Sequence, residues 1–179
     1  SKVSDSLGGK GVLWELFSFN PPTLHLYVRL CASSPYLSEI LTSNPGMIDE
    51  LMDSLVLNRL PSRDALEQTL TELCRGAKDT DPILHSFKNS QHLRVGVRDI
   101  LGKEGIEATT GALGNVAEVC LRRIALNAYD RLKERYGEPV LTGDDGNKRR
   151  CEFVILAMGK LGGCEPNYHS DLDVVFAYE

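Results

Sequence analysis

The sequence lacks several patterns that would place it in a special class of proteins. No stretch approaches the roughly 18 consecutive apolar residues of a membrane span, so no membrane is expected as a partner. The five cysteines are scattered and odd in number, without a Cys-x-x-Cys pair, which argues against a zinc site and a disulfide framework. The opening residues lack the apolar core of a signal peptide. We therefore expect a cytoplasmic location, where thiols stay reduced.

An excess of positive charge is also missing. The chain has 20 Lys and Arg residues against 25 Asp and Glu residues, which gives a net charge of −5. Proteins that bind nucleic acids usually present a basic face, so no nucleic-acid partner is expected. An acidic chain can still bind a nucleotide where a metal ion supplies positive charge. The hydrophobic fraction of 42% is that of an ordinary globular protein.

Helical periodicity dominates the first 141 residues. Thr23 is a plausible N-cap for one short helix, and Ser62 for a longer one. Apolar residues from Leu113 onward keep the helical period for about six turns. Glycines at 102 and 137 are expected to end the last two helices. The expected helices cover residues 12–19, 24–31, 36–41, 47–57, 62–74, 82–101 and 113–135.

The pattern changes after a polar loop at residues 142–150. Residues 151–158 form a nearly continuous apolar run of strand length, which is typical of a central strand covered on both faces. The sequence therefore predicts an α+β protein with a helical domain over residues 1–141 and part of a second domain over residues 151–179.

Two carboxylates in this second part are the strongest candidate for chemistry. Asp171 and Asp173 are expected to open a second strand. Side chains alternate along a strand, so residues two apart lie on one face. Carboxylate oxygens together with phosphate oxygens are the ligands that Mg²⁺ prefers. The pair thus predicts a magnesium site.

A glycine-rich turn precedes these carboxylates. Gly162 and Gly163 allow close approach of the backbone, and they can begin a short helix whose free N–H groups point at phosphates. Lys160 could add a positive charge, and Ser170 a hydrogen-bond donor. In nucleotidyl transfer, two divalent ions stabilise the attacking and leaving oxygens. The combination predicts binding of a nucleoside triphosphate such as ATP.

Each of these parts has a plainer explanation when it is taken alone. A Gly-Gly pair is usually a turn, an Asp-x-Asp pair is usually a solvated strand end, and Lys160 is otherwise a polar turn residue. The four histidines have no shared ligand spacing, and the arginines on the expected helices fit solvated faces. Only the order of strand, glycine turn, paired acids and second strand favours nucleotidyl transfer.

At this point the motifs resemble a known family. The stretches Gly159-Lys-Leu-Gly-Gly163 and Ser170-Asp-Leu-Asp-Val174, with Glu165 and Asn167 between them, are similar to the signature of the glutamine synthetase adenylyltransferase family. That family belongs to the nucleotidyltransferase superfamily, which includes DNA polymerase beta. Upstream segments such as Leu30-Cys-Ala-Ser-Ser-Pro35 also resemble these enzymes, so the resemblance covers nearly the whole chain.

The resemblance implies a fold and a set of site residues. The second domain would be the beginning of a mixed sheet like that of DNA polymerase beta. Asp171 and Asp173 would be catalytic residues that bind Mg²⁺, and Gly162, Gly163 and Ser170 would contact the nucleotide.

It also implies a function and partners. One half of these enzymes transfers AMP from ATP to a tyrosine of glutamine synthetase, which regulates nitrogen assimilation, and the other half removes AMP by phosphorolysis. The upstream stretches look more like the C-terminal, adenylylating half, although Asn167 also suits the other. The helices would pack as a core, dock glutamine synthetase, or relay a signal from a PII-type regulator. A non-catalytic helical interaction module is the alternative from another class.

One part of the superfamily pattern is not found in the sequence. The superfamily implies a third carboxylate on a further strand, and Glu179 is too close in sequence to Asp173 to supply it. The Ser- and Gly-rich stretch from Ser1 to Gly11 also reads as a cut end. We therefore expect the chain to be a fragment that is weakly active or inactive alone.

Overall fold

The structure is a computed structural model of the 179-residue chain, and it describes residues 18–19, 21–44, 47, 59–144 and 146–179. Apart from residues 18–19 and Met47, the helices expected at 12–19 and 47–57 lie outside the described residues. The described part is α+β, as predicted. Its helices are α3 (Pro21–Ser33), α4 (Pro35–Ser43), α6 (Arg63–Leu73), α7 (Asp81–Ile100), α8 (Ile106–Tyr136) and α9 (Gly159–Gly162).

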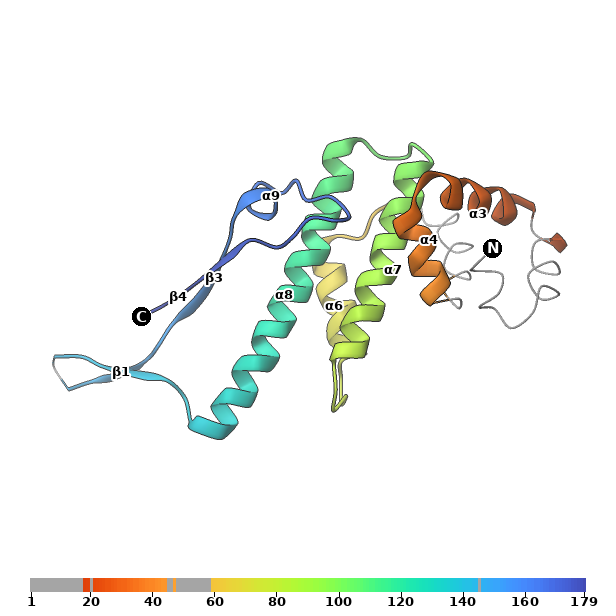
Figure 1. The fold of residues 1–179 in the computed structure, drawn as a ribbon. Coiled ribbons are helices and arrows are strands. Elements are labelled where there is room, and N and C mark those ends of the chain that lie inside the picture. Colours follow the sequence, from red (N-terminus) through yellow and green to blue (C-terminus); the bar gives the residue numbers. More distant parts are fainter. Residues whose placement is uncertain (1–17, 20, 45–46, 48–58, 145) are drawn as a thin grey trace.

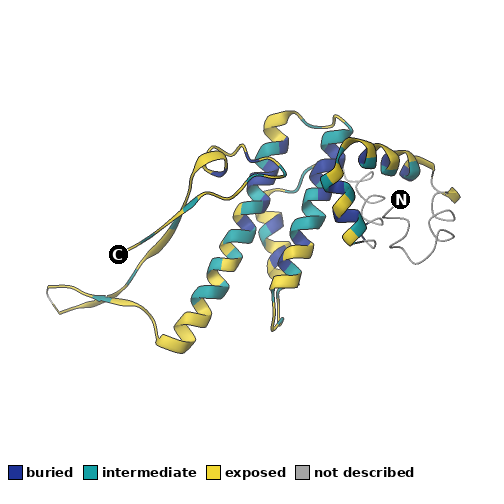
Figure 2. Cartoon of the chain, viewed as in Figure 1, coloured by how far each residue is buried: buried dark blue, intermediate teal, exposed yellow. Residues whose placement is uncertain are grey.

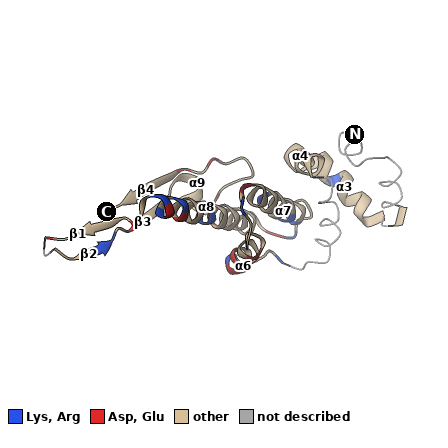
Figure 3. Ribbon diagram, turned by 90° about the horizontal axis from the view of Figure 1, so that it is seen from below, with Lys and Arg blue, Asp and Glu red and all other residues tan. Residues whose placement is uncertain are grey.

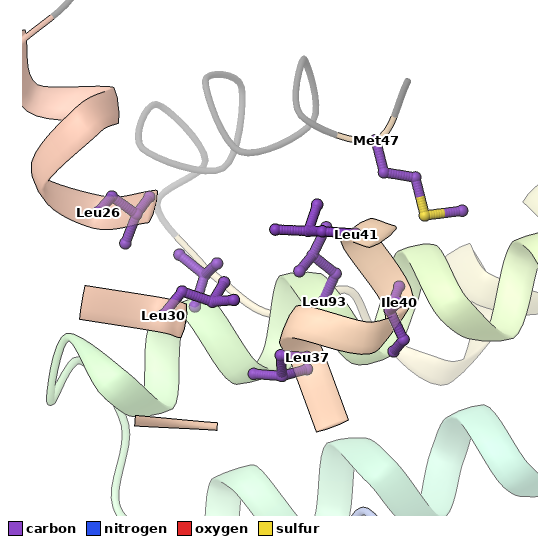
Figure 4. Packing of buried hydrophobic residues seen from close by; sticks show 8 residues of the cluster. Leu26, Leu30, Leu37, Ile40, Leu41, Met47 and Leu93 are labelled. Atoms are coloured by element: carbon purple, nitrogen blue, oxygen red, sulfur yellow. The ribbon is translucent and has the colours of Figure 1, made fainter. Parts of the chain in front are cut away.

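The long helices form the centre of the molecule. Figure 1 shows α7 beside α8, with α6 packed against both, while α3 and α4 lie against α7. Two main apolar clusters hold these helices together. One joins α3 and α4 to α7 through residues such as Leu30, Leu37 and Leu93 (Figure 4). The other joins α6, α7 and α8 through residues such as Leu70 and Phe87.

Several helix ends confirm the sequence predictions. The Ser62 hydroxyl accepts a hydrogen bond from the Ala65 N–H at 3.3 Å, as an N-cap does. Pro35 lies in the first turn of α4, where its missing N–H costs nothing. Gly102 and Gly137 follow α7 and α8 with φ of +65° and +85°. These positive values favour glycine.

Two helix starts differ from the predictions. Thr23 is not an N-cap, because α3 begins at Pro21 and places Thr23 inside the helix with 0% of its surface exposed. Proline fits the first positions of a helix, so the Pro21-Pro22 pair starts the helix rather than delaying it. Helix α8 begins at Ile106 rather than at Leu113. Gly111 lies in its interior without breaking it.

Two antiparallel strand pairs complete the described part. Strands β1 (Val140–Thr142) and β2 (Lys148–Arg150) form a hairpin, so the polar loop expected at residues 142–150 contains all of β2 and the last residue of β1. Strands β3 (Phe153–Ala157) and β4 (Val174–Tyr178) pair from Phe153 opposite Tyr178 to Ala157 opposite Val174. The expected mixed sheet remains a prediction, because these pairs do not test it.

Strand β3 is more exposed than expected of a central strand. Its residues Val154 and Leu156 are each 49% exposed, and Figure 2 shows the strands largely as exposed ribbon. The prediction of a strand covered on both faces is therefore wrong for the described residues. The physical reason is that the pair stands apart from α8. A groove of about 530 Å³, lined mainly by apolar side chains of α8, β3 and β4, lies between them.

Charged residues of both signs are interspersed along α6 and α8 (Figure 3). Two ion pairs join these helices, Arg63 with Glu118 at 2.7 Å and Arg122 with Glu67 at 3.5 Å. The side chains in both pairs are more than a third exposed, so each pair stabilises the packing only slightly. Within the described ranges, no helix combines the length and the apolar character that crossing a membrane requires.

Candidate functional site

The unit formed by β3, α9 and β4 carries the sequence-predicted site. The short helix α9 follows β3 directly, and the turn into it is made by Gly159, whose φ is +52°. The Met158 N–H donates to the Asp173 carbonyl at 2.8 Å, so the strand ladder continues one step past Ala157 and Val174. The Asp173 carboxylate then points at the turn. Its Oδ2 lies 2.7 Å from the position that a Cβ would occupy at Gly159.

The two carboxylates do not share a strand as expected. Strand β4 begins at Val174. Asp173 therefore directly precedes the strand, and Asp171 lies in the connection before it. The physical reason is that β3 turns away into α9 after Met158, so Asp171 and Leu172 have no backbone hydrogen bond to another described residue. Both acids are exposed, and neither carboxylate forms an ion pair or a hydrogen bond with another described residue.

Gly162 and Gly163 end the short helix rather than begin it. Gly162 is the last residue of α9, and its N–H donates to the Met158 carbonyl at 2.9 Å. The N–H of Gly163 donates to the Gly159 carbonyl at 3.0 Å. The sequence predicts that these N–H groups are free to bind phosphates. This prediction is wrong, because both groups already donate to carbonyl oxygens. Gly162 has a packing role instead, since a Cβ there would lie 2.6 Å from the Ala157 carbonyl oxygen.

Ser170 belongs to a tight turn with Asn167. The Ser170 hydroxyl accepts from the Asn167 N–H at 2.9 Å and lies 3.1 Å from Asn167 Oδ1, to which it donates. The same amide oxygen accepts from the His169 N–H at 2.9 Å. The Ser170 hydroxyl thus stabilises the turn that directly precedes Asp171. Lys160, by contrast, is exposed near the start of α9.

The described residues fit a metal site that is shared with a ligand. No group of three or more His, Cys, Asp or Glu side chains in this part of the chain could hold a metal ion alone. Asp171 and Asp173 have the oxygen chemistry that Mg²⁺ prefers, and Mg²⁺ usually binds one or two protein carboxylates together with substrate phosphates and water. The donor set is therefore compatible with a magnesium ion that a nucleotide helps to bind.

Glu179 lies at the other end of the strand pair from Asp173. Its backbone N–H donates to the Glu152 carbonyl at 3.3 Å, and its carboxylate pairs with Arg149. The Arg149 guanidinium holds the pKa of this carboxyl below its usual value. Glu179 is thus not part of the group around Asp173, in agreement with the sequence argument.

Sequence reasoning missed the residues that attach this unit to the helices. Pro166 is buried against α8, with its Cγ and Cδ 3.7 Å from the position of a Cβ at Gly114. The Tyr168 hydroxyl donates to Asp99 Oδ2 at 3.3 Å. The His169 ring meets the Tyr36 ring edge-on, with centroids 4.8 Å apart. These partners are 52 to 133 residues away in the chain, so no local pattern signals them.

A second polar contact near this unit joins Tyr36 of α4 to His92 of α7. The Tyr36 hydroxyl and Nδ1 of His92 form a hydrogen bond of 2.7 Å, in which the tautomer of His92 decides which group donates. Burial, reinforced by the charge of Lys88, lowers the pKa of His92 to about 4. Burial raises the pKa of Tyr36, with a smaller effect from Glu39. The neutral forms of both groups therefore persist near neutral pH.

Comparison with known proteins gives a consistent result along the chain. The family model described as glutamate-ammonia ligase adenylyltransferase matches residues 24–179. The chain is 33% identical to proteins named bifunctional glutamine synthetase adenylyltransferase/adenylyl-removing enzyme from Thioalkalivibrio sulfidiphilus and Methylococcus capsulatus. A protein of the same name from Shewanella oneidensis is 29% identical.

These matches cover 97–100% of the chain but only 18–19% of the relatives. The chain therefore spans less than a fifth of the length of the curated relatives that it matches. The match to the family model includes β3, α9, β4 and nearly all of the described helices. The chain belongs to the glutamate-ammonia ligase adenylyltransferase family.

Proposed function

We propose that this chain supplies part of the active site of an enzyme that transfers AMP from ATP to a tyrosine of glutamine synthetase. The tyrosine hydroxyl attacks the α-phosphorus, the bond from this phosphorus to the bridging oxygen breaks, and pyrophosphate leaves. The observation that carries the proposal is the Asp173 carboxylate directed at the Gly159 turn, in a chain whose family is described as glutamate-ammonia ligase adenylyltransferase.

Asp171 and Asp173 would hold Mg²⁺, which when bound neutralises charge on the phosphates. The turn at Gly159 lies beside the Asp173 carboxylate. Lys160 offers a positive charge at the same turn. Gly162 and Gly163 are exposed and have no side chains, so a nucleotide could contact their backbone directly. Ser170 would contact the nucleotide from the turn that it forms with Asn167.

The same proposal covers the organisation of the chain. Residues 1–141 form a helical domain, and residues 151–179 form part of a nucleotidyltransferase domain with a mixed sheet like that of DNA polymerase beta. The β1–β2 hairpin connects the two parts. The enzyme would act in the cytoplasm on glutamine synthetase, with a PII-type protein as a regulator.

A second activity is supported by the names of the relatives. They are called adenylyltransferase/adenylyl-removing enzymes, and phosphorolytic removal of AMP would need the same metal and phosphate contacts. A role as a non-catalytic helical module would instead leave the two aspartates dispensable.

The test compares aspartate variants in the full-length protein that carries this sequence. Asp171→Asn and Asp173→Asn keep the side-chain size but remove the charge that binds a metal. We expect transfer of radiolabelled AMP to glutamine synthetase to fall by about 10²-fold or more, with binding to glutamine synthetase intact. Asp144→Asn, in the exposed β1–β2 turn, is the matched control and should retain activity. Unchanged transfer in the site variants would support the non-catalytic module.

A further inference from the structure

The connection from α9 to β4 contacts three helices, and Tyr168 makes the contact with α7. Its ring packs against two apolar clusters, the one that joins α3, α4 and α7 and a smaller one around Val95, Ala112 and Leu113. Its hydroxyl donates to Asp99 near the end of α7. Burial, with a smaller effect from Asp99, raises the pKa of the Tyr168 phenol, so the donor stays protonated.

The two site carboxylates are held from different directions. Asp173 is held from the strand side, because its carbonyl accepts from the Met158 N–H. Asp171 has no backbone or side-chain hydrogen bond of its own within the described residues. It directly follows the Asn167–Ser170 turn, which is closed by three hydrogen bonds of 2.9 to 3.2 Å. Tyr168 lies within this turn, so an anchor on Tyr168 also fixes the start of the Asp171 segment.

We propose that Tyr168 is a positioning residue for the metal site, because its anchorage on α7 sets the place of Asp171 relative to Asp173. The helical part would then contribute to metal affinity without touching the metal. This inference rests on the proposed function of Asp171 and Asp173. A weakened anchor should raise the Mg²⁺ concentration needed for activity.

The experiment measures two constants in the full-length protein. One is the Mg²⁺ activation constant for AMP transfer, and the other is the dissociation constant of Mn²⁺ in the presence of an ATP analogue that cannot be hydrolysed, read from the electron paramagnetic resonance signal of the free ion. Tyr168→Phe keeps the ring and removes the hydroxyl, and Tyr168→Ala removes both. We expect both constants to rise, by about 3-fold in the first variant and about 10-fold in the second. The second value is at the lower end of the roughly 10- to 100-fold losses on mutating groups that orient metal ligands, and the first is smaller because the ring remains in place. Asp99→Ala should reproduce Tyr168→Phe, and the double variant should be no worse than either alone. If Tyr168→Ala does not fold, Tyr168→Phe and Asp99→Ala carry the test.

Two controls separate positioning from general effects. Tyr136→Phe removes a hydroxyl from a tyrosine that is 70% exposed on α8. Leu70→Ala destabilises the cluster of α6, α7 and α8, which Tyr168 does not join. Both should leave the Mg²⁺ activation constant within twofold of the wild-type value. An equal rise in Leu70→Ala would mean that Tyr168 acts only through stability, and this would overturn the proposal.

The remaining outcomes distinguish this inference from the proposed function. If the Asp171→Asn and Asp173→Asn variants lose activity but all Tyr168 and Asp99 variants keep the wild-type Mg²⁺ dependence, the positioning role is wrong and the proposed function stands. If the aspartate variants also keep wild-type activity, both proposals fail. The inference is supported when the aspartate variants lose activity and the Tyr168 variants shift only the Mg²⁺ dependence.

Discussion

The Oδ2 atom of Asp173 lies 2.7 Å from the place where a Cβ would stand at Gly159. A Cβ at this position would displace the carboxylate, and the φ of +52° is in the left-handed region that favours glycine. The turn therefore brings a carboxylate to the first residues of α9. This relationship ties the glycine-rich motif to the aspartate motif more closely than their separation in the sequence suggests.

Gly159→Ala should disturb the site more than the fold. A Cβ would push the exposed Asp173 carboxylate away, and the left-handed backbone costs about 1–2 kcal/mol for a residue with a side chain. We expect a loss of that size in the free energy of unfolding, measured by urea denaturation, and a clear loss of AMP transfer in the full-length protein. Transfer at the wild-type rate would show that the position of Asp173 is irrelevant to catalysis.

A pair of glycines on the long helices should respond in opposite directions. At Gly96 on α7, a Cβ would lie 2.3 Å from Cδ1 of Leu37, whose side chain is only 1% exposed and cannot move freely. Gly96→Ala should therefore destabilise the chain by about 1–3 kcal/mol. Gly111→Ala on α8 meets nothing within 4 Å and should stabilise it by about 0.5–1 kcal/mol. Denaturation of the 179-residue chain measures both, and equal effects would contradict the close approach of α4 and α7.

Stability should fall as the pH is lowered from about 6.5 to 4. In the unfolded chain His92 takes up a proton near its ordinary pKa of 6.5, whereas in the folded chain its pKa is about 4. Protons therefore favour the unfolded state within this window, and the two values differ by an amount that corresponds to roughly 3 kcal/mol. The stabilisation is complete above the window and lost below it.

Two variants test this assignment by denaturation at a series of pH values. His92→Asn keeps a side chain that can hydrogen-bond to the Tyr36 hydroxyl and does not titrate, so the stability of this variant should depend much less on pH between 4 and 6.5. His85→Asn, at an exposed position on the same helix, should keep the wild-type dependence. The assignment to His92 fails if the two variants lose the dependence to the same extent.

Features set by neighbouring residues could be predicted from the sequence. The cap at Ser62 and the ends of α7 and α8 at Gly102 and Gly137 depend on contacts within a few residues. Local rules were less reliable where two of them competed. Pro21 could either end one helix or start another, and tertiary packing of α3 selected the second.

Most of the site geometry depends on contacts that the sequence does not reveal. The pattern around Asp171 and Asp173 predicts a strand, but the turn of β3 into α9 removes the backbone partner that Asp171 would need. The anchor of Tyr168 on Asp99 spans 69 residues, and its partner is an ordinary polar residue on a helix. The sequence could thus identify the carboxylates, while the way in which the helices hold them required the structure.

The most direct test of the central claim is the effect of Mn²⁺ on the amide resonances of the 179-residue chain in the presence of an ATP analogue that cannot be hydrolysed. A paramagnetic ion broadens signals from nearby nuclei, so it reports its own location. If Asp171 and Asp173 hold the metal, low Mn²⁺ concentrations should first broaden the signals of residues 159–163 and 171–174, and the Asp171→Asn, Asp173→Asn double variant should abolish this effect. Broadening that is centred elsewhere, or that persists unchanged in the double variant, would contradict the account.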